Sequence, residues 1–479
     1  MRRPLDARAL PALSPRCAAL TIALLSAAVS LQGCGGEGAS GPPPAAAGGN
    51  SPSPLPTRTP TPAPTGPAVL PSHVVVLIQE NRSVDNLFNG FPGADTVTSG
   101  VNSKGQTVQL QPIGLNVHWD VGHAYSAFVT EFNNGKMNGW DLAPLACFIG
   151  SCPPPVTPFA YVKPADVVPY WELAKEFSLA DHVLQTSEGS SFPAHQYLIA
   201  GQSGGGDSDH LAMADSPDTP TGGCNINHAT IPTIDMRASF PAVEGNPIFP
   251  CLDYNTIFDE LTAKGLSWRY YTPTFNNIWA APIAIHHIWF TSQAQNIVAP
   301  ETRILTDIAA HKLANVSYVV PEVSLSDHSG YATLQGPDWI GTVANAIGDD
   351  PYYWKNTTVI VLWDDWGGWF DHYATHHPPN FPHDPYEFGF RVPLIAISAY
   401  VKQAGYVDHT PRDMTAVLGF LEHVFGLSSL GQRDRDTDDL FPMFNFNSLS
   451  PLPYKRVDTG GYTPSTFRYR ITDTRDVDD

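Results

Sequence analysis

The sequence predicts an α/β fold in which a mainly parallel central sheet is sandwiched by helices. Short runs of consecutive Val, Ile and Leu residues recur along the chain, which is typical of strands buried on both faces. Helix-like segments lie between these runs, and this alternation is typical of parallel sheets covered by helices. With 479 residues, 42% of them hydrophobic, the chain is long enough to build a large core.

The individual elements follow from local patterns. Each expected strand is a continuous apolar run that ends in polar residues, and each expected helix is a longer amphipathic segment. The expected strands are HVVVLIQEN from residue 73, VSYVVPE near residue 320, TTVIVLWDD from residue 357 and RVPLIAIS from residue 391. The expected helices cover Thr256–Gly265 and Asp338–Asp350.

The ends of the chain have a different composition from its middle. Residues 1–33 combine arginines with an apolar run of signal-peptide type, and they end in Leu31-Gln32-Gly33-Cys34, which resembles a bacterial lipobox with Cys34 as the lipidated residue. Plain cleavage or a retained anchor are the alternatives. We expect residues 34–70 to form a Pro/Gly/Ala-rich tether, residues 71–455 a single folded domain, and residues 456–479 a polar tail. We therefore expect an exported protein, either a periplasmic or cell-surface lipoprotein held at the membrane by this lipid or a secreted protein.

The charge of the chain argues against one class of partner, and its cysteine content indicates the compartment. The net charge of −20 and the pI near 5.1 argue against nucleic acid, which requires a basic surface. Beyond Cys17 and Cys34 there are four cysteines, an even number that suits an oxidising compartment. Of the three connectivities, Cys147–Cys152 with Cys224–Cys251 is the most economical.

Two pairs of polar residues follow two of the expected strands. Glu80 and Asn81 come after one run, and Asp364 and Asp365 after another. Ligands of open α/β sheets gather outside the carboxyl ends of strands, so these pairs can converge. Their oxygens suit a divalent cation, and Ca, Mg, Mn and Zn are not distinguished at this point. The alternative is that one aspartate caps a helix and the other faces solvent.

Three motifs in order resemble those of the bacterial phosphoesterase family, which includes phospholipases C and acid phosphatase A. They are HVVVLIQENRSVDNLF, VLWDDWGGWFDHYATHHPP and FGFRVPLIAIS, and the resemblance runs from about His73 to Gly426. It implies an alkaline-phosphatase-like fold and metal-assisted hydrolysis of phosphate esters, with phospholipids among the candidate substrates.

The resemblance also points to a nucleophile. EGSSFPAHQYLIAGQSGG, from residue 188, is similar to the family segment that carries a Ser or Thr. Matching Pro193 and His195 puts Ser191 at the nucleophile position, in contact with the metal, although Ser190 stands where proline is usual and Ala194 where asparagine is usual. Ser190 therefore stays an alternative nucleophile. Both hydroxyls could instead cap a helix that starts near Pro193.

Histidines are expected to supply protons and positive charge at the site. His123 lies in WDVGH, which resembles a family segment, and His328 and His287 match further family positions less tightly. His286 and Asp327 are weaker candidates. We interpret His372, His376 and His377, just after the second motif, as residues that support the metal ligands or form a lid.

Together these features predict a metal-assisted phosphoesterase that works through a covalent phosphoserine. The length of the chain after the motifs favours an acid phosphatase-like enzyme or a compact phospholipase C. One alternative is a catalytically silent, surface-binding lipoprotein on the same scaffold. A calcium-stabilised structural domain is another.

Overall fold

A computed structural model describes residues 69–148, 150–204, 210–219, 222–226, 228–373 and 388–467. The expected signal peptide, Cys34, nearly all of the tether, and His376 and His377 lie outside the described residues. Within these ranges, no helix combines the length and apolar character that crossing a membrane requires.

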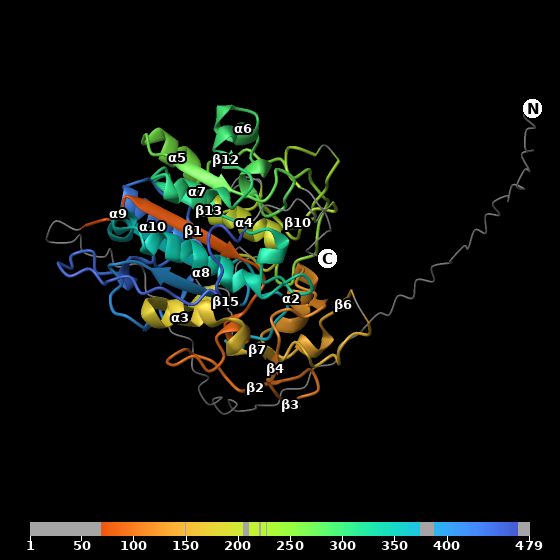
Figure 1. The fold of residues 1–479 in the computed structure, drawn as a ribbon. Coiled ribbons are helices and arrows are strands. Elements are labelled where there is room, and N and C mark those ends of the chain that lie inside the picture. Colours follow the sequence, from red (N-terminus) through yellow and green to blue (C-terminus); the bar gives the residue numbers. More distant parts are fainter. Residues whose placement is uncertain are drawn as a thin grey trace, which may run out of the picture. The chain divides into compact units, whose positions relative to one another are not determined.

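A nine-stranded sheet forms the centre of the fold (Figure 1). Its strand order is β12-β11-β13-β1-β14-β15-β8-β16, and the short β17 also pairs with β8. The bounds are β1 His73–Gln79, β8 Ser178–Leu184, β11 Trp268–Tyr271, β12 Ile297–Val298, β13 Val316–Val319, β14 Thr357–Trp363, β15 Arg391–Ile397, β16 Tyr406–Asp408 and β17 Arg412–Asp413.

Strand direction confirms the mainly parallel α/β class. β12, β11, β13, β1 and β14 are parallel to one another, and β8 is parallel to β16 and β17. β15 is the exception, because it runs antiparallel to both β14 and β8. β1, β14 and β15 are almost fully buried, as their continuous apolar runs predict.

Helices pack against both faces of the sheet. α3 contacts β8 and β15, and α8 contacts β14, α3 and α7. On the other face α5 contacts β11, and α4 lies against α5 and α10. Alternation along the strands agrees with this division. Tyr318 of β13 contacts α4 and α5, while Trp363, on the opposite face, packs on Tyr170 of α3.

The helix bounds differ by a few residues from the expected ones. α5 begins after Thr256, whose side chain forms a capping box with Asp259. α8 begins three residues before the expected Asp338. The α-helices are α1 Val84–Leu87, α2 Tyr125–Phe132, α3 Val168–Glu176, α4 Ser191–Ala200, α5 Ile257–Ala263, α6 His286–Trp289, α7 Arg303–Ala309, α8 Gln335–Gly348, α9 Pro351–Asn356, α10 Ala416–Phe425 and α11 Arg433–Asp436.

Four two-stranded sheets and several 3₁₀ turns complete the described fold. The small sheets pair β2 with β3, β4 with β7, β5 with β6, and β9 with β10. Their bounds are β2 Ser99–Val101, β3 Thr107–Gln109, β4 Gln111–Ile113, β5 Trp119–Val121, β6 Leu145–Cys147, β7 Ala160–Val162, β9 Leu211–Met213 and β10 Thr233–Asp235. The 3₁₀ turns are Trp140–Leu142, Pro164–Asp166, Ala281–Ala284, Ser292–Asn296, Val323–Leu325 and Phe441–Met443.

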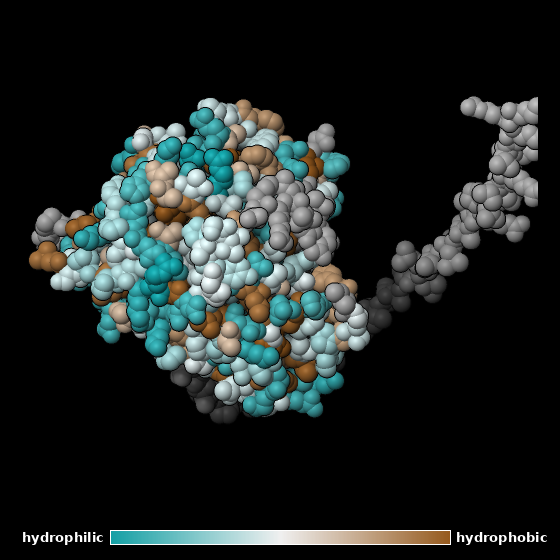
Figure 2. Space-filling model, viewed as in Figure 1, coloured by the Kyte–Doolittle hydropathy of each residue, from teal (hydrophilic) through white to brown (hydrophobic). Residues whose placement is uncertain are grey.

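Both expected disulfides are present. Cys147 is bonded to Cys152, and Cys224 to Cys251. Part of the expected polar tail is packed, since Val457 is buried and Phe467 lies edge-on against Trp339 of α8. On the face seen in Figure 2, hydrophobic residues are scattered among hydrophilic ones, which is ordinary for a protein surface.

Candidate active site

The register of β1 and β14 brings the two polar pairs together. The strands are parallel neighbours, and their last residues, Gln79 and Trp363, are paired. The residues that follow both strands therefore leave the sheet at the same edge. Glu80, Asn81, Asp364 and Asp365 are all fully buried there.

Asn81 connects the two pairs directly. Its backbone N–H donates to Asp364 Oδ1 at 3.0 Å. Its side-chain Nδ2 donates to both carboxylate oxygens of Asp365, at 3.0 and 3.1 Å. One amide residue thus holds both aspartates at the strand ends.

The glycine after Trp366 makes this close approach feasible. The backbone N–H of Gly367 donates to Asp365 Oδ1 at 2.7 Å. A Cβ at Gly367 would lie 2.3 Å from the carbonyl oxygen of Asn81, and the φ of +63° disfavours any side chain. Asn81 itself has a φ of 64°, a conformation that asparagine tolerates better than most residues. The turn therefore needs glycine where the sequence has it.

The first residue of α4 carries a hydroxyl into this cluster. Ser191 is fully buried, and its Oγ donates to Asp365 Oδ2 at 3.0 Å. Ser190, the residue before the helix, has its Oγ 2.9 Å from Ser216 Oγ instead. Of the two candidate nucleophiles, only Ser191 has a recorded contact with the acidic pairs within the part of the chain described.

His195 is a member of the cluster that the sequence analysis used only to align the motif. It lies one helical turn after Ser191, so both residues are on the same side of α4. Its Nε2 is 3.3 Å from Glu80 Oε1 and 3.5 Å from Asp364 Oδ2. The four-residue spacing from the serine is the signal that could have identified it.

Burial and His195 have opposite effects on the pKa of the Asp364 carboxyl. Burial raises the pKa of its carboxyl, but hydrogen bonding and the charge of His195 outweigh this, so the pKa lies below its usual value. No Lys or Arg among the described residues forms an ion pair with Asp364. A buried carboxylate without a Lys or Arg partner among the described residues is well placed to bind a cation.

The oxygens of the cluster fit a divalent cation. Asn81 Oδ1 is buried and has no hydrogen-bond partner among the described residues. Glu80 and Asp364, with His195, also bring one potential ligand atom each within 4.8 Å of one another. Hard oxygen donors of this kind suit Mg²⁺, Ca²⁺ or Mn²⁺, and one imidazole adds compatibility with Zn²⁺.

His123 and His328 form a second buried group with Asp120. The two rings are 5.4 Å apart, and His328 Nδ1 is 4.0 Å from Asp120 Oδ2. Each Nδ1 contacts a backbone carbonyl, Val121 O at 2.7 Å and Ser329 O at 2.8 Å respectively. Because a carbonyl only accepts, Nδ1 carries hydrogen in both rings, and Nε2 is the position that can exchange a proton.

The other suggested residues have contacts elsewhere. His287 lies between Asp253 and Asp259, at 2.6 and 3.0 Å, and Asp259 caps α5. His286 is exposed beside Phe290. Asp327 accepts from Trp363 Nε1 at 2.9 Å, and burial raises its pKa to about 6. In the described part of the chain, the contacts given for these three residues are therefore with groups other than the acidic pairs.

His372 belongs to a neighbouring ionic network. Its Nδ1 is 2.6 Å from Asp85 Oδ2. The fully buried Arg391 donates through Nε to Asp371 Oδ1 at 2.8 Å and through Nη2 to Asp85 at 3.4 Å. Arg391 stands in the third sequence motif, but its role as the cation of this network was not predicted.

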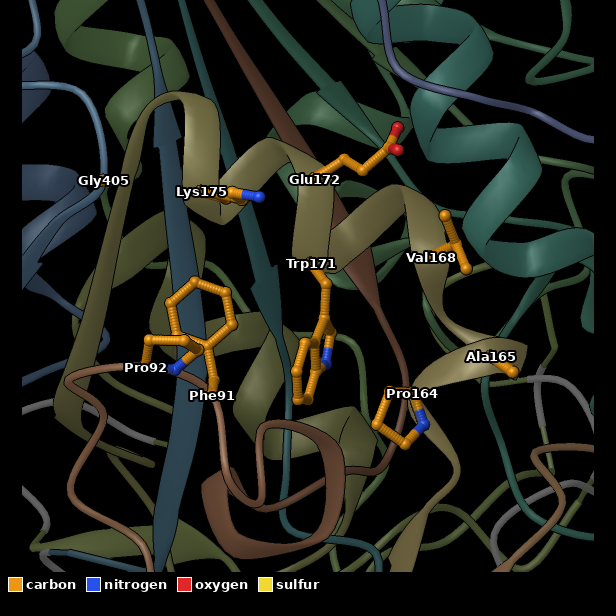
Figure 3. A pocket seen from close by; sticks show the side chains of 9 residues that line it. All are labelled: Phe91, Pro92, Pro164, Ala165, Val168, Trp171, Glu172, Lys175 and Gly405. Carbon is orange, nitrogen blue, oxygen red and sulfur yellow. The ribbon is translucent and has the colours of Figure 1, made fainter.

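An apolar cavity of about 530 Å³ lies apart from these clusters (Figure 3). Trp171 and Phe91 form its walls, with Lys175 and Glu172 of α3 at its rim. None of its lining residues belongs to the acidic pairs or to the histidine group.

These features define an α/β protein with a serine hydroxyl beside a buried, oxygen-rich cation site at the carboxyl ends of parallel strands. The sequence profile of the Phosphoesterase family matches residues 72–428. The chain belongs to this family.

Curated relatives include bacterial phospholipases C. The chain is 24% identical to the non-hemolytic phospholipase C of Pseudomonas aeruginosa, over 80% of this chain and 58% of that protein. It is 23% identical to phospholipase C A of Mycobacterium tuberculosis, over 79% of each. The chain thus spans a little over half the length of the Pseudomonas relative.

Among solved structures, a protein in the alkaline phosphatase superfamily from Vibrio parahaemolyticus matches with a TM-score of 0.34 and 12% identity, covering 77% of this chain and 72% of that one. Murine ectonucleotide pyrophosphatase/phosphodiesterase 5 matches with a TM-score of 0.34 and 11% identity, covering 57% and 94%. At these values the matches carry no inference about the chemistry.

Proposed function

We propose that this protein is an exported, metal-assisted phosphoesterase that hydrolyses phosphate esters through a phosphoserine at Ser191. The observation that carries the proposal is the hydrogen bond from Ser191 Oγ to Asp365 Oδ2, 3.0 Å long, within the buried cluster of strand-end carboxylates. Membership of the Phosphoesterase family supports the same reaction class.

Glu80, Asn81, Asp364 and Asp365 would hold the cation, with the Ser191 hydroxyl as a further ligand. When bound, a divalent cation there supplies positive charge beside the phosphoryl oxygens and lowers the pKa of a neighbouring hydroxyl. The start of α4 adds the partial positive charge of its backbone N–H groups, which favours an anion at the same place.

In the first step Ser191 Oγ forms a bond to phosphorus, and the bond from phosphorus to the ester oxygen breaks. The hydroxyl hydrogen passes to Asp365, which already accepts it as a hydrogen bond. His123 or His328 donates a proton from Nε2 to the departing alcohol oxygen. In the second step water bonds to phosphorus and the same imidazole takes up a proton of the water. The phosphoserine bond breaks, and Ser191 Oγ takes back the hydrogen held by Asp365.

The substrate class is either a phosphate monoester, as for an acid phosphatase, or a phospholipid, as for a phospholipase C. The names of the curated relatives favour the phospholipid. Parallel assays with p-nitrophenyl phosphate and phosphatidylcholine separate the two classes. Release of choline phosphate without free phosphate supports a phospholipase C, and free phosphate from the monoester supports a phosphatase.

Paired serine variants test the nucleophile. Ser191→Ala is expected to lower turnover by at least about 10³-fold, because it removes the attacking atom. Ser190→Ala, one residue away and bonded to Ser216, is the matched control and is expected to keep turnover near the wild-type level. Mass spectrometry of acid-quenched protein should find phosphate on Ser191. The reverse result for the two serines would refute the assignment, and a wild-type chain inactive on both substrates would favour a silent binding protein.

A further inference from the structure

A second group of imidazoles and carboxylates lies around β8, away from the proposed active site. Asp181 and His182 belong to β8, Asp95 to the segment after α1, and His409 to the segment after β16. The Asp181 side chain is fully buried, whereas those of Asp95 and His409 are 42% and 51% exposed. The inner end of the group is therefore buried, and its outer end is open to solvent.

The side chains are already in mutual contact. His409 Nδ1 is 2.8 Å from Asp181 Oδ1, and His182 Nε2 is 2.9 Å from Asp95 Oδ2. The backbone N–H of Asp95 donates to Asp181 Oδ2 at 2.7 Å, which ties the two acidic residues together. Asp181, His182 and His409 offer one ligand atom each within 4.8 Å of one another.

Arg391 and His372 offset part of the charge of Asp95 but not that of the Asp181 carboxylate. Its Nε and Nη2 donate to Asp371 and Asp85, while Nη1 donates to the backbone carbonyls of Asp95 and Asp181. The Asp95 carboxylate forms longer ion pairs, with Nη1 at 3.8 Å and with His372 Nε2 at 3.4 Å. Among the described residues no Lys or Arg ion pair reaches the Asp181 carboxylate, so with neutral imidazoles a bound divalent cation would balance its buried charge.

We propose that Asp95, Asp181, His182 and His409 bind a zinc ion. Two imidazoles and two carboxylates are a donor set that zinc accepts in tetrahedral geometry. With bonds of about 2.1 Å, ligand atoms in a tetrahedron are roughly 3.4 Å apart. The two contacting pairs, at 2.8 and 2.9 Å, would therefore open toward that distance, and Asp95, which is outside the group of three converging ligand atoms, would move toward the other ligands. On binding, each imidazole nitrogen replaces the hydrogen it shares with a carboxylate by a bond to zinc, and any displaced proton leaves to solvent.

The ion would join three segments that are distant in sequence: the one after α1, strand β8, and the one after β16. Its role would therefore be to hold this corner of the fold together. The proposal is independent of the phosphoesterase chemistry, because none of its ligands contacts Ser191 or the strand-end acidic pairs in the recorded interactions.

Zinc counting on the full chain tests the proposal. Protein stripped with a chelator and dialysed against Zn²⁺ is analysed for bound metal by elemental mass spectrometry. The variant Asp364→Asn, which impairs the proposed active site, is expected to retain one zinc per chain, and adding His182→Ala and His409→Ala is expected to remove it. His311→Ala serves as the matched control, because His311 forms a 2.6 Å pair with Asp350 outside this group.

Two results would overturn the proposal. One is an Asp364→Asn chain that binds no zinc, and the other is an unchanged zinc count and affinity after both histidines are replaced. If the double replacement does not fold, as judged by circular dichroism, His409→Gln alone carries the test, because this side chain is half exposed. Loss of one ligand should then weaken zinc binding at least about tenfold. Turnover of the phosphate ester is expected to stay unchanged in the histidine variants.

Discussion

Two buried carboxylate clusters follow the same two strands but are neutralised differently. Asp364, directly after β14, has His195 beside it and no Lys or Arg partner among the described residues. Asp371, a few residues further on, pairs with the buried guanidinium of Arg391 at 2.8 Å. Both carboxylates are fully buried, so desolvation alone does not distinguish them.

The pKa values of the two carboxyl groups, Asp364 and Asp371, are shifted in opposite directions. The pKa of Asp364 is lowered, since the hydrogen bond and charge of His195, together with hydrogen bonds to Glu80 and Ser191, outweigh the effect of burial. The pKa of Asp371 is raised, because burial and the charge of Asp85 outweigh Arg391. A permanent arginine makes the second cluster a fixed part of the fold, whereas the first leaves its charge to be balanced by a cation from solution.

The largest expected effect is on folding. Arg391→Met should lower the free energy of unfolding by about 3–5 kcal/mol, because it leaves buried carboxylates without their cation. Adding Asp371→Asn should restore part of this loss by removing one of those charges. Urea denaturation measures both variants, with Arg237→Met at the exposed Asp235 pair as a neutral control. If Arg391→Met loses no more unfolding free energy than Arg237→Met, Arg391 does not stabilise its cluster and the proposed difference between the two clusters is wrong.

Metal removal should have an intermediate effect. Protein stripped by a chelator is expected to gain about 2.7 kcal/mol in the free energy of unfolding when Mg²⁺ is added at one hundred times Kd. Mg²⁺ is the cation of choice because it prefers oxygen ligands and does not suit the imidazole-containing group around β8. Asp364→Asn should lose this increment while remaining close to the chelated wild type, because asparagine still accepts the hydrogen bond from Asn81. Thermal unfolding at several cation concentrations gives the comparison. If the cation stabilises Asp364→Asn as much as it stabilises the wild type, it binds at another site.

The smallest effect concerns His287, a histidine outside both clusters. Burial lowers its pKa, but hydrogen bonds and charge from Asp253 and Asp259 outweigh this and leave the pKa raised above 6.5. A raised pKa means that the folded state binds the proton more tightly. The contribution of His287 to the free energy of unfolding is therefore fully present below pH 6.5. It is lost as the pH rises through the pKa of His287 in the folded state.

His287→Ala should accordingly flatten the pH dependence of unfolding in that window, with turnover at the wild-type level. Denaturation curves at several pH values, with activity measured alongside, provide the check. A large fall in turnover would instead return His287 to the active site, as its family position suggested.

Features encoded locally were predictable from sequence. Apolar runs identified β1 and β14, and the polar residues at their ends identified the acidic pairs. Features that depend on distant segments were not. The antiparallel direction of β15 cannot be inferred from an apolar run that would look alike in either direction. The contacts of His195 with Glu80 and Asp364 depend on how α4 docks against the sheet.

All ten residues of α4 are buried, from Ser191 to Ala200. A helix without a solvent-facing side cannot fray or swing outward unless the layers around it separate. The hydroxyl of Ser191, the proposed nucleophile, is therefore held by the protein interior rather than by a flexible loop. On heating, activity and tertiary structure should disappear together, along a single curve.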